Sequence, residues 1–286
     1  MPTSAPWRIF GVDFTSSPRA RKPITIAAGH LQGRDFALQG IEEHREWESY
    51  ETWLREPGPW VGGFDFPFGL PREAVIDLAW PQTWAALVLH CRSLGRERFR
   101  AELDLYRQSR QPGNRYAHRA ADFPARSHSP LKLVNPPVGL MFIEGVPRLI
   151  DAGISVPGLH AADPARIAFE AYPGFTARRM VGGSYKNDAA AKQTPARKRA
   201  RKAIVDGLVS TRNPFGFSLI APPSLLASMV NDASGDRLDA VLCAMQAAWA
   251  WQRRQDNYGL PADIDPLEGW IATVPEIKVI SDQPQE

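Results

Sequence analysis

Residues 8–39 read RIFGVDFTSSPRARKPITIAAGHLQGRDFALQ. Apolar and β-branched residues gather in three stretches of this segment, which predicts strands over residues 8–14, 23–28 and 34–39. Residues 29–33 supply a turn between the last two strands. Because short turns connect them, we expect the three strands to form an antiparallel meander.

Two further strands are expected later in the chain. One covers residues 60–66 (WVGGFDF) and stops at Pro67; the other covers residues 166–172 (RIAFEAY) and stops at Pro173. Helical patterns separate these strands, so they should lie parallel to the first strand. Helices are predicted over residues 46–55, 72–110, 196–208, 222–231 and 236–254, and residues 111–163 form a long excursion rich in Pro, Gly, Ser and Asn.

These elements predict one α/β domain over residues 1–286. Its core is a mixed five-stranded sheet with helices on both faces, and strand 8–14 lies in the middle beside strand 60–66. A helical and loop insertion over residues 72–163 separates the fourth strand from the fifth. The composition agrees, since 44% hydrophobic and 23% charged residues are ordinary values for a globular protein.

The sequence excludes several classes of protein. It holds no run of 18 apolar residues and no signal peptide, so we expect no membrane contact and a cytoplasmic location. The two cysteines, Cys91 and Cys243, lie far apart and outside any CxxC motif, which argues against a zinc site or a disulfide framework.

The charge is uneven along the chain. The formal net charge is only +3, but residues 178–202 hold nine Lys and Arg against one acid. Residues 92–132 hold ten Lys and Arg against four acids. Such segments indicate a polyanionic partner; the alternative is a solvated helix face with scattered surface charge.

Carboxylates stand out near the ends of three strands. Asp13, Asp65 and Glu170 each lie in an otherwise apolar run, where an unpaired carboxylate would be costly to bury. If the strands are parallel neighbours, these side chains meet at one edge of the sheet, where α/β proteins bind ligands. Each residue also has a structural alternative: Asp13 as a turn cap or arginine partner, Asp65 in a strand-ending turn, and Glu170 as an arginine partner.

The last long helix brings two more carboxylates. Asp236 and Asp239 share a face of its first turn, and residues 240–251 are apolar except for Gln246. Carboxylates that converge from strand ends and a helix start form an all-oxygen site suited to Mg²⁺ or Mn²⁺. The alternative for Asp236 is a helix cap or a partner of the helix dipole.

Four stretches of the sequence together resemble motifs of the domain-of-unknown-function family 429, whose members are described as RNase H-like nucleases. They are GVDF, FDFPFGLP, FEAYPG followed by SYK, and GDRLDAVLCA. The resemblance covers residues 9–251. It implies an RNase H-like fold and nuclease activity. The late DRLDA also resembles the DxxDA motif of RuvC-type resolvases, which implies metal ligation by Asp13, Asp65, Asp236 and Asp239.

The implied reaction is two-metal hydrolysis of a phosphodiester in a nucleic acid or a nucleotide-like substrate. Asp13, Asp65, Glu170 and Asp239 would be the catalytic residues, although Glu170 matches only the EAYP motif of family 429 and has no RuvC counterpart. Basic residues would then hold the phosphate backbone: Arg115, Arg119, Lys186, Arg197, Lys198 and Arg201.

Two other functions stay open. Sugar-kinase and actin-like ATPases share this sheet, but they need a Gly-rich hairpin after the first-strand Asp and two copies of the fold. Here no Gly lies between Asp13 and Gly29, and one copy is evident. The other possibility is a binding protein that keeps the fold without catalysis.

Overall fold

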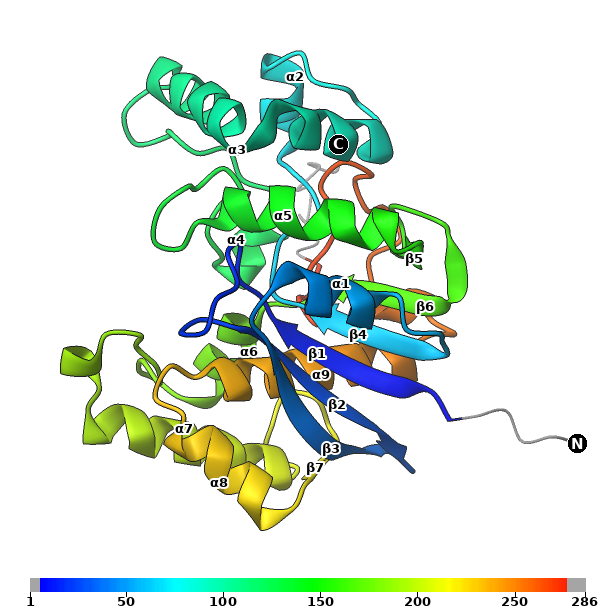
Figure 1. The fold of residues 1–286 in the computed structure, drawn as a ribbon, viewed down its shortest axis with the longest axis vertical. Coiled ribbons are helices and arrows are strands. Elements are labelled where there is room, and N and C mark those ends of the chain that lie inside the picture. The colour runs from blue at the N-terminus through cyan, green and yellow to red at the C-terminus, as the bar shows by residue number, and fades with distance from the viewer. Residues whose placement is uncertain (1–5, 277–286) are drawn as a thin grey trace, which may run out of the picture.

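A mixed β-sheet runs through the centre of the protein (Figure 1). The computed structural model describes residues 6–276, without the side chain of Ala190; residues 1–5 and 277–286 of the expected domain lie outside the described part. Within that part the sheet has seven strands in the order β5-β6-β4-β1-β2-β3-β7. Their bounds are β1 Arg8–Asp13, β2 Ile24–Gln32, β3 Asp35–His44, β4 Trp60–Phe64, β5 Ile154–Ser155, β6 Asp163–Glu170 and β7 Leu219–Ile220.

The predicted strand directions are confirmed. β1, β2 and β3 form an antiparallel meander, with Asp13 opposite Thr25. β4 runs parallel to β1 and places Phe64 opposite Val12, and β6 runs parallel to β4 and places Glu170 opposite Phe64. The first strand therefore lies in the middle of the sheet beside β4, as expected, and the carboxyl ends of β1, β4 and β6 share one edge.

The expectation of five strands is wrong in number. The five expected strands form the centre of the sheet, and the two-residue strands β5 and β7 extend its two edges. Two residues carry no alternation of polar and apolar side chains, so no sequence pattern marks such strands. The predicted turn over residues 29–33 is also too long: β2 continues to Gln32, and the chain reverses at Gly33, whose φ is 63°.

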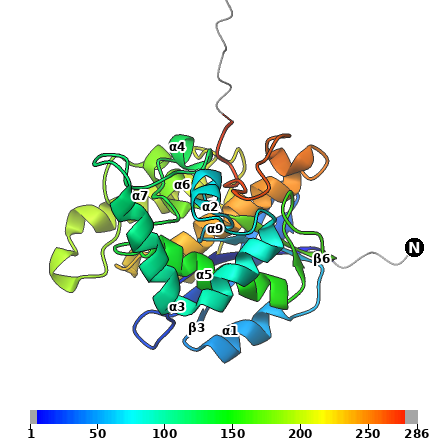
Figure 2. The ribbon, with the colours of Figure 1, turned by 90° about the horizontal axis from the view of Figure 1, so that it is seen from above.

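Helices cover both faces of the sheet, as predicted. On one face lie α1 (Trp47–Leu54), α3 (Trp84–Ser109) and α5 (Val138–Asp151) (Figure 2). Their apolar side chains pack in a core rich in aromatic residues. On the other face, α7 (Pro195–Val209), α8 (Pro223–Asn231) and α9 (Asp236–Gln252) enclose a second core. The remaining helices are α2 (Arg72–Asp77), α4 (Asp122–Ala125), α6 (Pro173–Met180) and two 3₁₀ turns, Ala190–Lys192 and Asn257–Gly259.

The insertion between β4 and β6 contains more helix than the sequence indicates. The Pro- and Gly-rich residues 111–163 include the 14-residue helix α5, with Pro147 inside it. Burial of its apolar face, including Phe142 and Val146, outweighs the low helix propensity of Pro and Gly. A Cβ at Gly145 would lie 2.7 Å from the ring of Phe66, so this glycine permits close packing of α5. No helix within residues 6–276 has the length and apolarity of a membrane span.

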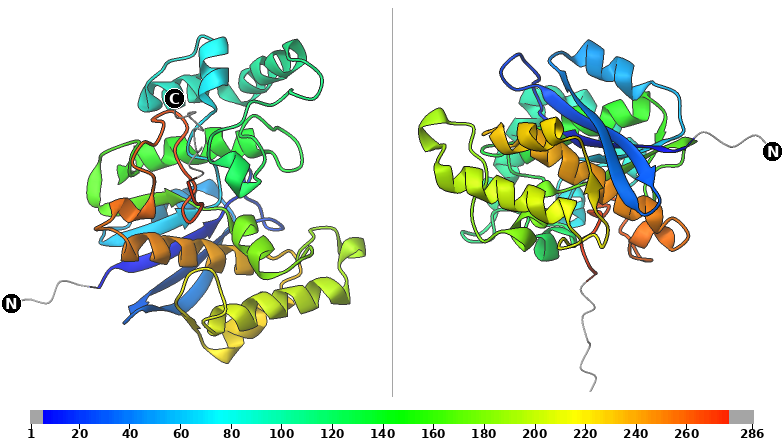
Figure 3. Two further views of the ribbon diagram at one scale, coloured as in Figure 1. Left: turned by 180° about the vertical axis from the view of Figure 1, so that it is seen from behind. Right: turned by 90° about the horizontal axis from the view of Figure 1, so that it is seen from below.

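Helix α9 lies directly on the central strands (Figure 3, left). A Cβ at Gly11 of β1 would overlap the backbone of Ala240 and Ala244, and a Cβ at Gly63 of β4 would overlap the carbonyl oxygen of Cys243. Only glycine allows this approach of a helix backbone to a strand. The contact fixes the first turn of α9 close to the carboxyl end of β1.

Candidate functional site

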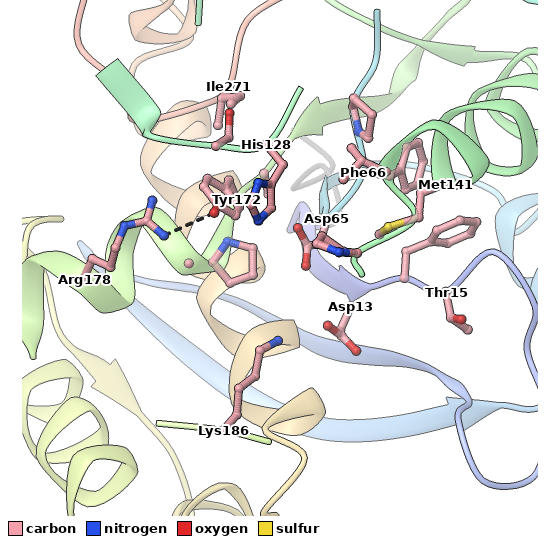
Figure 4. Close-up of a pocket in the computed structure, with 18 of the residues that line it drawn as sticks. Asp13, Thr15, Asp65, Phe66, His128, Met141, Tyr172, Arg178, Lys186 and Ile271 are labelled. Carbon is pink, nitrogen blue, oxygen red and sulfur yellow. Dashed lines mark hydrogen bonds between the residues drawn. The ribbon is translucent and has the colours of Figure 1, made fainter. Parts of the chain in front are cut away.

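A cleft of about 1000 Å³ opens at the carboxyl ends of β1, β4 and β6 (Figure 4). Asp13, Asp65 and Glu170 all line it, so the predicted convergence of the three strand carboxylates is observed. Three connections form its walls: residues 14–22 after β1, residues 126–138 within the insertion, and residues 171–188 after β6. The cleft therefore lies where ligands bind in open α/β sheets.

Asp13 and Asp65 are direct neighbours at this edge. Asp13 ends β1, and the amide of Asp65 donates to the carbonyl oxygen of Val12 at 2.9 Å. No group within residues 6–276 donates a hydrogen bond to either carboxylate. Burial raises the pKa of Asp65 to about 7. Burial, followed by repulsion from Asp236, raises the pKa of Asp13 well above its usual range.

Asp239 lies near these two residues and is 0% exposed. The hydroxyl of Tyr185 donates to its Oδ1 at 2.6 Å, and the amine of Lys186 donates to its Oδ2. Burial raises the pKa of Asp239, while Lys186 opposes that rise. Burial alone would lower the pKa of Lys186, but Asp239 and the other nearby acids raise it well above its usual value.

Asp236, at the start of α9, forms a salt bridge with Lys22. The Nζ of Lys22, on the connection between β1 and β2, donates to Asp236 Oδ1 at 2.6 Å. Lys22 and Lys186 line the cleft, whereas Asp236 and Asp239 do not. From the sequence, a metal ion or the helix N-terminus was expected to balance the negative charge of these two carboxylates. In the structure a lysine pairs with each of them. Accordingly, no three His, Cys, Asp or Glu side chains of residues 6–276 are placed together as metal ligands.

Glu170 is engaged within the protein. Arg119 donates to its Oε1 at 2.6 Å and to its Oε2 at 2.7 Å, and the amide of Phe68 donates to Oε2 at 2.8 Å. Arg119 also pairs with Asp122 at 3.0 Å. This buried cluster ties the insertion to the end of β6, so we assign Glu170 to the scaffold of the cleft.

The predicted phosphate-binding residues fall into different environments. Lys186 faces the cleft, but Arg119 is committed to its buried ion pairs. Arg201 is buried and donates to the carbonyl oxygens of Tyr185, at 2.7 Å, and Val230, at 2.9 Å. The other three residues do not line the cleft: Arg115 and Lys198 are exposed, and Arg197 donates to Ser184 and Lys192.

Sequence reasoning missed a group of basic residues at the far side of the cleft: Arg126, His128 and Arg178. Arg178 donates to the hydroxyl of Tyr172 at 3.1 Å (Figure 4) and to the carbonyl oxygen of Ala125 at 2.6 Å. The guanidinium of Arg126 has no hydrogen-bond or ion-pair partner in the described part of the chain. The basic segments 92–132 and 178–202 were the available signal, but only the folded chain shows which of their residues face the cleft.

No family model, curated protein or solved structure matches this chain. A functional proposal therefore rests on the cleft itself. One side carries Asp13 and Asp65 with the lysines Lys22 and Lys186, and the other side, the basic wall, carries Arg126, His128 and Arg178.

Proposed function

We propose that this chain is a metal-dependent phosphodiester hydrolase of RNase H-like fold that acts on nucleic acid or a nucleotide-like phosphodiester. One observation carries the proposal: Asp13 and Asp65 lie side by side at the ends of parallel strands, face a large cleft, and have no partner within residues 6–276. The antiparallel meander followed by two parallel strands supports the fold assignment. The resemblance of the sequence motifs to those of family 429 and the RuvC-type resolvases supports the reaction class.

The residues at the edge fit a hard divalent cation. Asp13 and Asp65 offer carboxylate oxygens, the ligands that Mg²⁺ and Mn²⁺ prefer. Their raised pKa values arise first from burial and, for Asp13, next from the neighbouring acid Asp236, so the ionised pair favours a counter-ion. The resemblance also implies Asp236 and Asp239 as ligands, and there an ion would compete with Lys22 and Lys186 for the carboxylates.

The bound cation would supply positive charge to the phosphoryl group and make a water molecule more acidic. The rest of the cleft would hold the substrate. Arg126 and Arg178 would contact phosphate oxygens next to the scissile bond, and His128 lies beside them. Burial and the nearby charge of Lys132 lower the pKa of His128, which favours its neutral form at pH 7.

A panel of labelled substrates tests the proposal. The panel contains single-stranded DNA, single-stranded RNA, both duplexes, an RNA–DNA hybrid and a four-way junction, each with Mg²⁺, Mn²⁺ or EDTA. We expect cleavage of at least one substrate with metal and none with EDTA. The Asp13→Asn variant should lose at least 100-fold in rate, because it keeps its shape but loses a charge that the ion needs.

The matched control is Asp151→Asn, which changes an exposed aspartate paired with Arg92 far from the cleft and should leave the rate unchanged. Absence of metal-dependent cleavage, or equal rates for Asp13→Asn and the wild type, would reject the proposal. Binding of nucleic acid without cleavage would then favour the non-catalytic alternative, and a rise in melting temperature with ATP would favour a phosphotransferase.

A further inference from the structure

We infer that Lys186 occupies the place of a second metal ion, so that the site holds one divalent cation on Asp13 and Asp65 and uses the Lys186 ammonium group as its second positive charge. This inference rests on the proposed function and changes the expected number of ions from two to one. Lys186 would then contact the substrate directly, and Asp239 would position Lys186 without binding metal.

The first argument is the state of Asp239. Both of its oxygens are engaged, Oδ1 by the Tyr185 hydroxyl and Oδ2 by the Lys186 amine, and its side chain has no exposed surface. An ion bound to Asp239 would have to displace the Lys186 amine from this buried carboxylate.

The second argument is that the position of Lys186 is built into the fold. Arg201 donates to the carbonyl oxygen of Tyr185 at 2.7 Å, and the amide of Asn187 donates to the carbonyl oxygen of Ala233 at 3.2 Å. Gly235 has a φ of 83°, and a Cβ there would lie 2.8 Å from Lys186 Cβ. The chain therefore holds Lys186 against the turn that precedes α9, and its amine extends toward Asp13 and Asp65 (Figure 4).

The third argument is the charge of the cluster. When a bound cation keeps Asp13 and Asp65 ionised, four carboxylates and two ammonium groups leave a charge of minus two before the ion is counted; the groups are Asp13, Asp65, Asp236, Asp239, Lys22 and Lys186. A single divalent ion neutralises that charge. The count leaves out Glu170, which lies in a separate buried group with Arg119 and Asp122, and Asp188, which is largely exposed.

In this arrangement the protons and bonds of hydrolysis balance without another reactant. The oxygen of a water molecule bonds to phosphorus, the bond from phosphorus to the leaving oxygen breaks, and the proton of the water passes to solvent. Lys186 stays protonated and donates a hydrogen bond to an oxygen of the phosphoryl group as negative charge develops there. The leaving oxygen takes its proton from solvent.

Calorimetric titration with Mn²⁺ at pH 7.5 tests the inference. We expect the wild type to bind one ion per chain. The double variant Lys186→Met/Asp239→Asn removes the ion pair without changing the net charge, so it should still bind one ion with a Kd within about threefold of the wild type. With the best substrate of the panel, the same variant should lose at least 100-fold in cleavage rate at saturating Mn²⁺.

The matched control is Arg92→Met/Asp151→Asn, a charge-neutral removal of a remote surface pair that should change neither quantity. Any one of three results would overturn the inference: two ions per wild-type chain, loss of Mn²⁺ binding in the Lys186→Met/Asp239→Asn variant, or an unchanged cleavage rate in that variant. The wild-type titration needs no variant to fold. Two bound ions together with cleavage would refute only the inference, whereas a wild type that neither binds Mn²⁺ nor cleaves would refute the proposed function.

Discussion

The amide of Asp65 donates to the carbonyl oxygen of Val12 at 2.9 Å, which continues the pairing of β4 with β1 one residue beyond the end of β4. This hydrogen bond holds the backbone of Asp65 beside Asp13. The two residues therefore lie side by side because their strands pair in parallel.

Metal-free protein should become less stable as the pH rises from 5 to 8. The pKa of Asp65 is raised from 3.8 to about 7 by burial, so the folded state holds its proton more tightly than the unfolded state does. The resulting stabilisation is complete below about pH 4 and is lost as the pH rises through 7. Melting temperatures in EDTA should fall across this range, and the fall should be smaller for Asp65→Asn.

Asp163→Asn is the control for that experiment. Hydrogen bonds from Arg166 and from the amide of Ala165 lower the pKa of Asp163, so this carboxylate stays ionised between pH 5 and 8. The Asp163→Asn variant should therefore keep the wild-type slope in that range. Equal slopes for Asp65→Asn and the wild type would show that Asp65 does not titrate in this range.

Removal of Arg119 should destabilise the fold strongly. Arg119→Met leaves the buried carboxylates of Glu170 and Asp122 without their partner, a change that costs about 3–5 kcal/mol in comparable buried ion pairs. Urea denaturation measures the loss. Arg92→Met, which breaks an exposed pair with Asp151, should cost less than about 1 kcal/mol. Similar costs for the two variants would contradict the scaffold role of the Glu170 cluster.

The close contact of α9 with β1 predicts a strong effect of one methyl group. In Gly11→Ala the new Cβ overlaps backbone atoms of Ala240 and Ala244, so the helix has to move, at about 3 kcal/mol or more of stability. Gly40→Ala in β3 is the matched control, because nothing lies within 4 Å of its Cβ position. Chemical denaturation should separate the two variants; a Gly11→Ala protein as stable as Gly40→Ala would contradict the packing described.

Binding of nucleic acid should depend on the basic wall of the cleft. Arg126→Ala removes a guanidinium that has no partner within residues 6–276, and each lost phosphate contact reduces the slope of log K against log salt by about 0.7–0.9. Fluorescence polarisation in EDTA at several salt concentrations gives the slope. Arg115→Ala, exposed and outside the cleft, should leave it unchanged. A reduced slope for Arg115→Ala together with an unchanged slope for Arg126→Ala would place the nucleic-acid-binding surface outside the cleft.

The central strands and the strand carboxylates were predictable because local pattern encodes them. Asp13, Asp65 and Glu170 each interrupt a buried apolar strand near its end, and parallel pairing then brings them to one edge. Helix α5 was missed because its Gly and Pro residues lower its propensity, while burial against the sheet stabilises it.

The lysine partners were not predictable from the sequence. Lys22 reaches Asp236 across 214 residues, and Lys186 reaches Asp239 across 53. Both lysines lie in connections whose conformation depends on the assembled sheet, and no fixed spacing links them to the acids. Lys186 was noticed as a basic residue, but its salt bridge, and with it the argument for a single ion, needed the folded chain.

The shift in melting temperature that Mn²⁺ causes at pH 7.5 tests most directly whether Asp13 and Asp65 form a cation site. At an ion concentration 100 times the Kd, binding stabilises the folded state by about 2.7 kcal/mol, which raises the melting temperature by about 5 °C in a chain of this size. We predict that shift for the wild type and for Asp151→Asn, and less than half of it for Asp13→Asn and Asp65→Asn. A wild type without a shift, or equal shifts in all four proteins, would contradict the account.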